Sequence, residues 1–272
     1  MSYNNFVQTF WSSHIQTELA AQCVFTDFTN RQFEPELIKG GAHLKILGVE
    51  RPTIGTYVQG QDINIETVPD NSQFLDITEQ DYFAFEVDDV DEAQTKNGLM
   101  EALSSEATIA LAQKTDVFLA GLVSGGTKST NSTAITTEAL AKKAVDDAFV
   151  KLWENNVPIT EKTELIITPW FYNLFKNHLQ GLETDNMKLI KDGIVGYYQN
   201  ARVKMSNNIY NTGTYDNMCL RTNKAMAYAS QISDTEAFRL EKRFSDAIKG
   251  LHVYGGKVVR PKELICIQVK DA

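Results

Sequence analysis

The chain has 272 residues, of which 43% are hydrophobic and 22% charged, so its composition excludes a largely disordered protein. Its 35 acidic and 26 basic residues give a formal net charge of −9, whereas a freely acting nucleic-acid-binding protein usually carries a surplus of Lys and Arg. Three widely separated cysteines without a CxxC motif argue against a disulfide framework and predict reduced, mostly buried thiols.

The amino-terminal residues do not resemble a targeting segment. They lack the basic region and the apolar run of a signal peptide. No apolar run in the chain approaches the ~18–20 residues that a membrane helix needs. We therefore expect a protein that is made and kept in a cytoplasm and has no membrane partner.

Residues 1–35 begin with an apolar arm. Its large side chains recur at spacings typical of a short amphipathic helix, and they are Phe6, Phe10, Trp11, Ile15 and Leu19. An apolar arm is buried either on its own chain or on a neighbour, and the sequence leaves both alternatives open. Phe6, Phe10 and Trp11 are therefore candidates for a face that binds a partner.

Residues 40–87 have the pattern of β-strands. Apolar and polar residues alternate in Leu44–Ile46, Ile63–Glu66 and Phe83–Val87, and glycines separate the segments. Few large apolar side chains lie between Lys45 and Glu66. This stretch therefore predicts a long hairpin that extends away from the globule.

Residues 88–123 predict a long helix, about 50 Å from end to end at ~1.5 Å per residue. The expected apolar face consists of Met100, Leu103, Ala107, Ala110 and Val117. Asp88, Asp89, Asp91 and Glu92 crowd its beginning, where negative charge is favoured by the helix dipole. This acidic cluster could also attract a divalent cation, but it lacks the pattern of an EF-hand loop. A polar loop is expected over residues 124–133.

The remaining chain predicts alternating short helices and strands. A helix begins at Thr136 or Thr137 and buries Leu140, Ala144, Ala148 and Leu152. Glu164–Ile167 reads as a strand, and Pro169 opens a helix that continues to His178. Short strands follow at 203–205, 219–220 and 226–229, and the end of the chain, 252–269, is rich in strands. The fold class is therefore α+β.

No catalytic motif is evident. Gly126–Ser129 approximates a phosphate-binding loop, but Thr127 is inserted between the glycine and Lys128, and a helix rather than a strand precedes it. A nucleotide-dependent enzyme that uses this loop stays the alternative from another class. The four histidines are scattered, and neither HExxH nor GxSxG occurs. We predict no enzyme activity and no catalytic, cofactor or metal site.

Several stretches, in order along nearly the whole chain, resemble the major capsid proteins of tailed bacteriophages, which have the Hong-Kong-97-type fold. The stretches are Phe10–Leu19 with Val24–Arg31, Pro52–Tyr57 with Ile63 and Ile65, Tyr82–Asp91 with Gln94, Asp192–Asn208 and Gly250–Pro261. The resemblance implies an N-terminal arm (1–39), an extended E-loop hairpin (40–75) and a peripheral domain with a spine helix (76–130). It also implies a mixed α/β axial domain (131–248) and return strands of the peripheral domain (249–272).

The resemblance also implies a function. We expect a virion capsid protein that assembles with copies of itself, as hexamers and pentamers, into an icosahedral shell around double-stranded DNA, without sequence-specific DNA binding. Implied partners are a scaffolding protein, a portal protein and a decoration protein, with assembly in the host bacterial cytoplasm. The expected contacts between subunits involve Phe10, Trp11, Arg31, Arg51, Pro52, Ile54, Tyr57, Asp88, Asp89 and Asp91.

Two departures from the family and one related alternative complete the prediction. Some members begin with a long scaffolding segment, whereas here the arm begins almost at Met1, so we expect a separate scaffold. Some members are crosslinked through Lys and Asn, but no matching set is found around Lys39 and Lys45, so we expect non-covalent assembly. An encapsulin-like nanocompartment shell is the alternative within the same fold.

Overall fold

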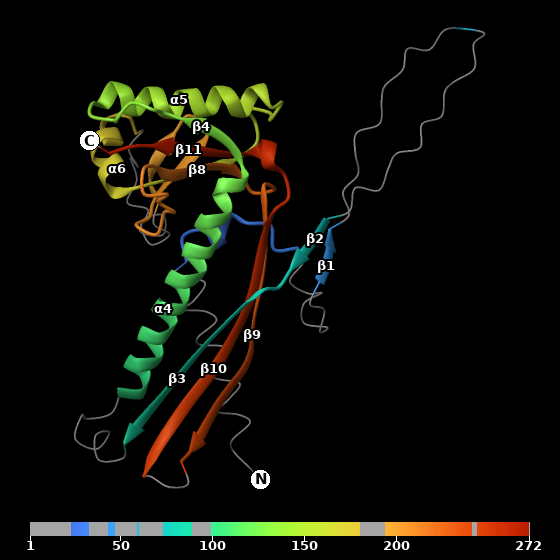
Figure 1. Cartoon of the computed structure of the whole chain (residues 1–272), viewed down its shortest axis with the longest axis vertical. Coiled ribbons are helices and arrows are strands. Elements are labelled where there is room, and N and C mark those ends of the chain that lie inside the picture. Colours follow the sequence, from blue (N-terminus) through green and yellow to red (C-terminus); the bar gives the residue numbers. More distant parts are fainter. Residues whose placement is uncertain are drawn as a thin grey trace.

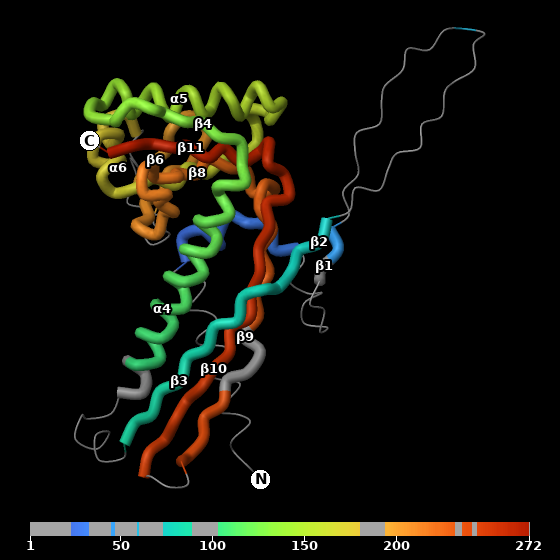
Figure 2. The backbone as a smooth tube through the Cα atoms, in the orientation of Figure 1, coloured from blue at the N-terminus to red at the C-terminus, as the bar shows by residue number. Residues whose placement is uncertain are grey.

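The computed structural model describes residues 23–32, 43–46, 59, 73–88, 99–179, 194–240 and 244–271. Two bodies follow one another along the longest axis of the molecule (Figure 1). One contains a six-stranded sheet covered by helices, and the other is elongated and pairs one long helix with a three-stranded sheet. The backbone passes between the two bodies several times (Figure 2).

The six-stranded sheet has the order β4-β11-β8-β5-β7-β6. Its strands are β4 (Thr127–Thr130), β11 (Leu264–Val269), β8 (Asp216–Thr222), β5 (Thr163–Ile167), β7 (Ala201–Met205) and β6 (Ile194–Tyr198). β4 is parallel to β11 and β5 is parallel to β7, and the other pairs are antiparallel. The sheet is therefore mixed.

Helices cover one face of this sheet. α5 (Glu138–Glu154) and α6 (Pro169–Phe175) pack against its central strands in one core, and the short η3 (Lys176–His178) follows α6. Side chains alternate between the faces of a strand, and so Leu165 and Ile167 enter this core whereas Ile166 points to the opposite face. The predicted start at Thr137 and the buried Ala144, Ala148 and Leu152 are confirmed, because the Thr137 side chain accepts a hydrogen bond from Leu140 and these three residues are buried.

The elongated body consists of α4 (Leu99–Leu122) and a sheet of order β3-β10-β9. The strands are β3 (Glu79–Asp88), β10 (Ser245–Val258) and β9 (Met226–Arg239), all antiparallel. Beside it, β1 (His43–Ile46) and β2 (Gln73–Asp76) form a two-stranded sheet. The remaining short helices are η1 (Thr26–Phe28), η2 (Val123–Gly125) and η4 (Pro261–Glu263).

The predicted apolar face of the long helix is wrong at two positions, whereas Leu103 and Ala107 are partly buried. Ala110 and Val117 are exposed, and the side chains that α4 buries are Ser104, Thr108, Leu111, Ala112, Thr115, Asp116, Leu119 and Ala120. Most of these polar side chains have hydrogen-bond partners: the Thr108 and Thr115 hydroxyls donate to carbonyls one turn earlier, whereas the Ser104 hydroxyl has no partner among the described residues. A search for apolar periodicity alone selects the wrong face of such a helix.

Two local predictions also need correction. The polar loop expected over 124–133 contains strand β4, whose residues 127–130 pair with β11. Asp88 does not begin a helix but ends β3, opposite Ser245. In both places a polar segment is held by strand pairing with a distant part of the chain, which local sequence does not encode.

The sheets divide the chain at positions different from the expected domain boundaries. β9 lies within the range expected for the axial domain but pairs with β10, whereas β4 and β11, expected in the peripheral domain, belong to the six-stranded sheet. The E-loop stretches 47–58 and 60–72 lie outside the described residues. The mixed α+β class is confirmed, and the assignment of E-loop, peripheral and axial domains stays a prediction.

Candidate functional site

An N-terminal strap, residues 23–30, lies where the two bodies meet. Phe25 is buried in the core formed by the end of α4, the second face of the six-stranded sheet and the start of β9. At the end of the strap, Asn30 exchanges two backbone hydrogen bonds with β9, donating to Met226 and accepting from Tyr228. The strap therefore joins three elements that are far apart in sequence.

Asp116 on α4 holds the beginning of the strap. One oxygen of its buried carboxylate accepts from the Val24 amide at 2.9 Å and the other from the Phe25 amide at 3.1 Å. Burial raises the pKa of Asp116 above its ordinary value, although the two amides oppose this effect. A charged side chain on the buried face of α4 thus satisfies two backbone donors that no strand or helix pairs.

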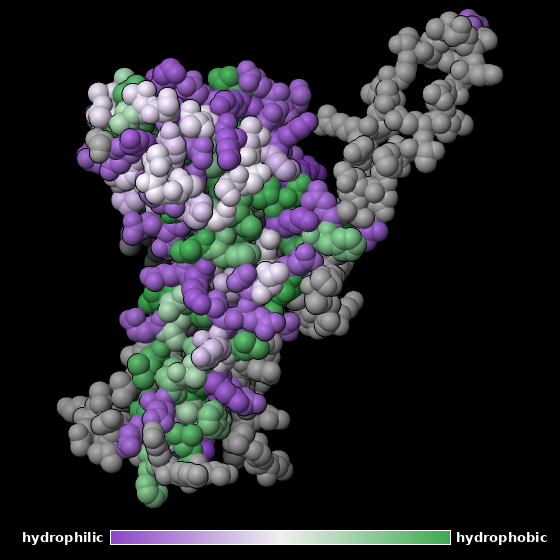
Figure 3. Space-filling model, in the orientation of Figure 1, coloured by the Kyte–Doolittle hydropathy of each residue, from purple (hydrophilic) through white to green (hydrophobic). Residues whose placement is uncertain are grey.

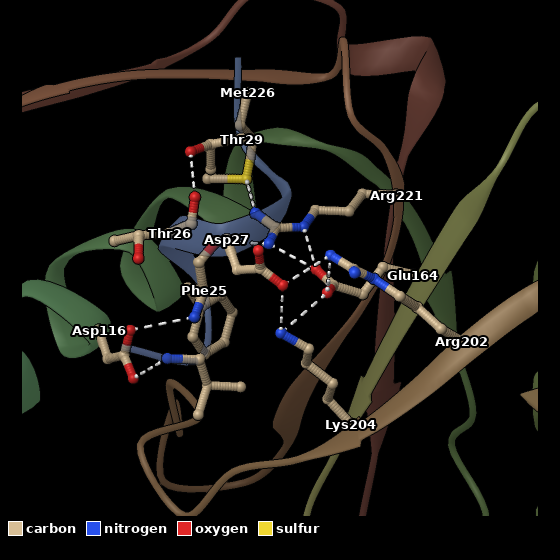
Figure 4. A network of polar contacts seen from close by, with 11 residues as sticks. Phe25, Thr26, Asp27, Thr29, Asp116, Glu164, Arg202, Lys204, Arg221 and Met226 are labelled. Atoms are coloured by element: carbon tan, nitrogen blue, oxygen red, sulfur yellow. Dashed lines mark hydrogen bonds and ion pairs between the residues drawn. The ribbon is translucent and has the colours of Figure 1, made fainter. Parts of the chain in front are cut away.

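Three strands bring charged side chains together under the strap. Glu164 on the central strand β5 stands directly opposite Arg221 on β8 and Arg202 on β7. Directly opposite residues in neighbouring strands have their side chains on the same face. This face looks toward the strap, and Figure 4 shows the charged groups converging there.

Arg221 is fully buried and bonded to both the sheet and the strap. Its Nε and Nη2 donate to Oε2 of Glu164 at 3.0 and 2.6 Å, and Nη2 also donates to the Phe25 carbonyl oxygen at 2.5 Å. Burial lowers the pKa of Arg221, but the adjacent Glu164 carboxylate more than compensates, so the pKa is raised and the guanidinium stays charged. The Phe25 backbone is therefore held on both sides, by Asp116 and by Arg221.

Asp27 supplies a charge from the strap itself. Its Oδ2 lies 3.0 Å from Nη2 of Arg202 and 2.8 Å from Nζ of Lys204. The same two cations lie 3.1 and 3.6 Å from Oε1 of Glu164. Burial raises the pKa of Asp27, but the hydrogen bond and charge of Lys204, followed by Arg202, bring it below the ordinary value.

The cluster balances its charges only when the strap is in place. The sheet contributes three cations, Arg202, Lys204 and Arg221, against Glu164, and α4 adds Asp116. Asp27 adds the third negative charge. Since buried charges are tolerated when paired and hydrogen-bonded, the arrangement favours a strap held in one position, and nothing in it provides a nucleophile or a general base beside a substrate cavity.

The surroundings of the three cysteines disfavour the thiolate form. Cys23, Cys219 and Cys266 are buried free thiols, as predicted. Burial raises their pKa values to about 12, 12 and 11, respectively. The thiolate, which is the reactive form, is therefore scarce at neutral pH.

The described residues add no metal centre. Within them, no three His, Cys, Asp or Glu side chains gather as a metal site would require. Nor does any helix of the described ranges have the length and apolar character needed to cross a membrane.

Two of the ten predicted contact residues lie within the described part of the chain. Arg31 is exposed next to the strap, with its guanidinium 5.5 Å from the centre of the Tyr228 ring. Tyr228, beside Arg31, pairs with Gly256 of β10, and Asp88 pairs with Ser245 of the same strand. At ~3.3 Å per residue, the positions of Arg31 and Asp88 are therefore roughly 35 Å apart along β10. Outside the described residues are Phe10, Trp11, Arg51, Pro52, Ile54, Tyr57, Asp89 and Asp91.

The sequence prediction missed the charge cluster. A sequence signal was present, because Glu164, Lys204 and Arg221 each lie next to apolar residues in a strand that is largely buried. Charged residues are almost never fully buried unless they are paired. Three such residues in separate strands could have indicated that these strands share one buried network.

Known proteins match this architecture. The family model described as phage capsid protein matches residues 75–267. A solved structure from Mycobacterium phage Che8 is 30% identical, with a TM-score of 0.70 over 89% of each chain. The capsid of cyanophage P-SCSP1u is 16% identical, with a TM-score of 0.66 over 86% of this chain and 84% of that one.

A virus-like particle from Pyrococcus furiosus is 12% identical, with a TM-score of 0.57 over 97% of this chain and 99% of that one, a likeness of fold alone. No curated protein sequence matches. The family match spans more than half of the chain, and the Che8 chain combines the same fold with substantial sequence identity. The chain therefore belongs to the phage capsid protein family, as a major capsid protein of a tailed bacteriophage.

Proposed function

We propose that copies of this chain assemble as hexamers and pentamers into an icosahedral shell that encloses the double-stranded DNA genome of the phage. The observation that carries the proposal is the match of the phage capsid protein family model to residues 75–267, which the 30% identity to the Che8 chain supports. A scaffolding protein, a portal protein and a decoration protein are the further partners we propose, with assembly in the host cytoplasm.

The surface of the elongated body supports repeated contacts between copies. Figure 3 shows hydrophobic residues exposed along this body, whereas polar residues dominate the visible face of the other. Tyr82 on β3 and Phe244 beside β10 are both 79% exposed, and Val117 on α4 is 53% exposed. The other body also exposes large apolar side chains, among them Ile159 at 68%, so both bodies carry surface that association could cover.

The packaged DNA should contact the shell weakly. Each subunit carries a formal charge of −9, and the shell repeats that charge many times. Tight binding would need a surplus of Lys and Arg that displaces counterions from the phosphates. We therefore propose that the inner wall of the shell repels DNA weakly, which would favour packaging of the genome and its later release.

We also propose that the E-loop, near residues 45–66, lies across an adjacent subunit. Pro52, Ile54 and Tyr57 would supply its apolar contacts. Arg51 would pair with a neighbour's acidic group near Asp88, Asp89 and Asp91. Phe10, Trp11 and Arg31 are proposed contacts of the arm.

Assembly is the test of the shell. Purified full-length chain, alone and co-expressed with the scaffold encoded beside it, should form closed particles in electron micrographs. A chain that stays a stable monomer under both conditions would contradict the proposal. Neighbouring terminase and portal genes would distinguish a phage shell from an encapsulin-like compartment, whose neighbour would be a cargo enzyme.

Deleting Arg51–Gln61 should abolish shell formation while leaving the subunit folded. A hairpin of two strands is marginal in water by itself, so it contributes little to the stability of its own chain. Hydrogen exchange of residues 50–62 should be fast in free subunits and slow in shells. Equal, strong protection in both states would show that the hairpin packs on its own chain. Arg51→Ala alone should reduce assembly only mildly, because an exposed ion pair contributes only ~0–1 kcal/mol.

The structure argues against the nucleotide-binding alternative. Residues 127–130 form a strand paired with β11, and the Lys128 carbonyl accepts a hydrogen bond from Lys151. The backbone of this segment is thus committed to the sheet and does not form a loop around phosphates. Lys128→Ala should therefore leave assembly and infectivity largely intact, as measured by particle yield and plaque titre. Loss of a nucleotide-dependent activity in this variant would instead support the alternative of a nucleotide-dependent enzyme.

A further inference from the structure

His252 is buried between α4 and the three-stranded sheet. Its side chain is 1% exposed, and neither ring nitrogen has a hydrogen-bond partner among the described residues. The ring stacks on Tyr254 with centroids 4.7 Å apart. Tyr254 in turn contacts Phe118 of α4 edge-on, which shows that this face of β10 looks toward the helix. Burying an imidazole without partners costs much more free energy when the ring is charged than when it is neutral.

A carboxylate stands next to this ring but is already engaged. Asp81 lies directly opposite His252 on β3. Its Oδ1 is 2.5 Å from Nζ of Lys114 on α4, and its Oδ2 accepts from the Tyr254 hydroxyl at 2.8 Å. Asp81 is therefore the polar link that joins α4, β3 and β10, and it is also the charge that a protonated His252 would attract.

We propose that His252 is an acid-sensitive switch, in which protonation of its imidazole draws Asp81 away from Lys114 and loosens α4 from the three-stranded sheet. The added proton comes from solvent and creates an imidazolium that cannot stay buried without a counter-charge. Either Asp81 rotates toward the ring, or the ring moves toward water. Both movements break the packing at the centre of the interface between α4 and the sheet.

The surrounding charges set the pH range. Burial lowers the pKa of His252 to about 4, and Asp81 only partly opposes this effect. Tyr254 on β10 stacks on the ring, and the groups that act on Tyr254 or Asp81 are Glu79 on β3, Lys114 on α4 and Tyr228 on β9. Burial raises the pKa of Tyr254, and Asp81 raises it further, so this hydroxyl keeps its proton.

The direction of the effect follows from proton linkage. The folded state takes up a proton at His252 only near pH 4, whereas the unfolded chain does so near pH 6.5. Neutral His252 thus contributes fully to the free energy of unfolding above pH 6.5, and this contribution falls between pH 6.5 and 4. The folding equilibrium constant decreases by up to tenfold per pH unit in that range. Asp116 acts oppositely, because its raised pKa favours the folded state on acidification. Asp27 and Asp81, whose pKa values are lowered, act only below about pH 4.

The experiment compares free full-length subunits of wild type, His252→Phe and His178→Phe between pH 7 and 4. Hydrogen exchange over α4 residues 108–120, corrected for the intrinsic pH dependence, reports the contact with the sheet, and α5 residues 141–152 serve as the internal reference. We expect wild type and His178→Phe to lose at least tenfold of their α4 protection on acidification, with α5 unchanged. His252→Phe should retain its α4 protection.

A second measurement does not depend on the variant folding. Histidine-labelled wild-type protein should show one imidazole that titrates near pH 4 in its NMR spectrum, and its resonance should be absent from His252→Phe. An ordinary titration near pH 6.5 for this ring would overturn the proposal. So would equal loss of α4 protection in wild type and His252→Phe.

Discussion

Glu164→Gln is expected to lower the free energy of unfolding by about 3–5 kcal/mol, the range for a buried ion pair that loses one partner. Glu164 is fully buried and is the carboxylate that stands between Arg202 and Arg221, with Lys204 beside it. Without its charge, three buried or half-buried cations would share Asp27 and the more distant Asp116. The side-chain amide keeps the shape of the carboxylate, so packing changes do not account for the loss.

Glu161→Gln is the matched control. Glu161 makes an ion pair with Lys224 at 2.6 Å, but both side chains are partly exposed, and such pairs contribute ~0–1 kcal/mol. Urea unfolding of the free subunit, with an unchanged slope between the variants, measures both effects. An equal, small loss in the two variants would show that the buried cluster does not stabilise the fold.

A double replacement tests whether the loss of stability comes from an unpaired buried charge or from the loss of the ion pair itself. Glu164→Leu combined with Arg221→Met removes a negative and a positive charge and fills the site with apolar side chains. Replacing a buried ion pair in this way is often nearly neutral, whereas removing one partner is not. We therefore expect the double variant to be more stable than Arg221→Met alone, measured by the same urea midpoints.

Asp116→Ala is expected to release the strap and to lower the free energy of unfolding by about 2–4 kcal/mol, from two lost charge-assisted hydrogen bonds and two amides left without a partner. The Val24 and Phe25 amides receive these bonds. Alanine favours the helix and offsets a few tenths of a kcal/mol, because its helix propensity exceeds that of Asp.

Exchange of the Val24 and Phe25 amides distinguishes release of the strap from general destabilisation. They should exchange about 100-fold faster in Asp116→Ala, while α5 amides change less, since a loss of ~2.7 kcal/mol at one contact corresponds to that factor. Asp147→Ala is the control, because Asp147 makes only an exposed i,i+4 pair with Lys143. Unchanged protection of residues 24 and 25 would mean that Phe25 packing alone holds the strap.

Local patterns were sufficient for many elements of the fold. The α5 helix has both a capping Thr137 and an apolar face at helical spacing, and β5 is a short apolar run before a proline. In these segments local preference and burial agree, so the sequence predicts them without knowledge of the rest of the chain. The buried cysteines follow from composition in the same way.

Pairing partners could not be predicted so well. Residues 127–130 are polar and became a strand because β11, more than 130 residues later, lies beside them. The buried face of α4 includes Ser104, Thr108, Thr115 and Asp116. A search for apolar residues at helical spacing does not find this face, because these four side chains are polar. Amides of the strap pair with Asp116, and carbonyls of α4 itself accept hydrogen bonds from Thr108 and Thr115.

Several single elements, the mixed class and the lack of any catalytic motif were thus readable along the chain, because each depends on neighbours within a few residues. The charge cluster and the site of His252 were not, because each joins positions that strand register brings together: Glu164 with Arg202 and Arg221, and His252 with Asp81. A one-residue change of register would turn these side chains to the opposite face. Long-range pairing therefore decides whether a charged residue in an apolar strand is solvated, paired or left alone in the interior.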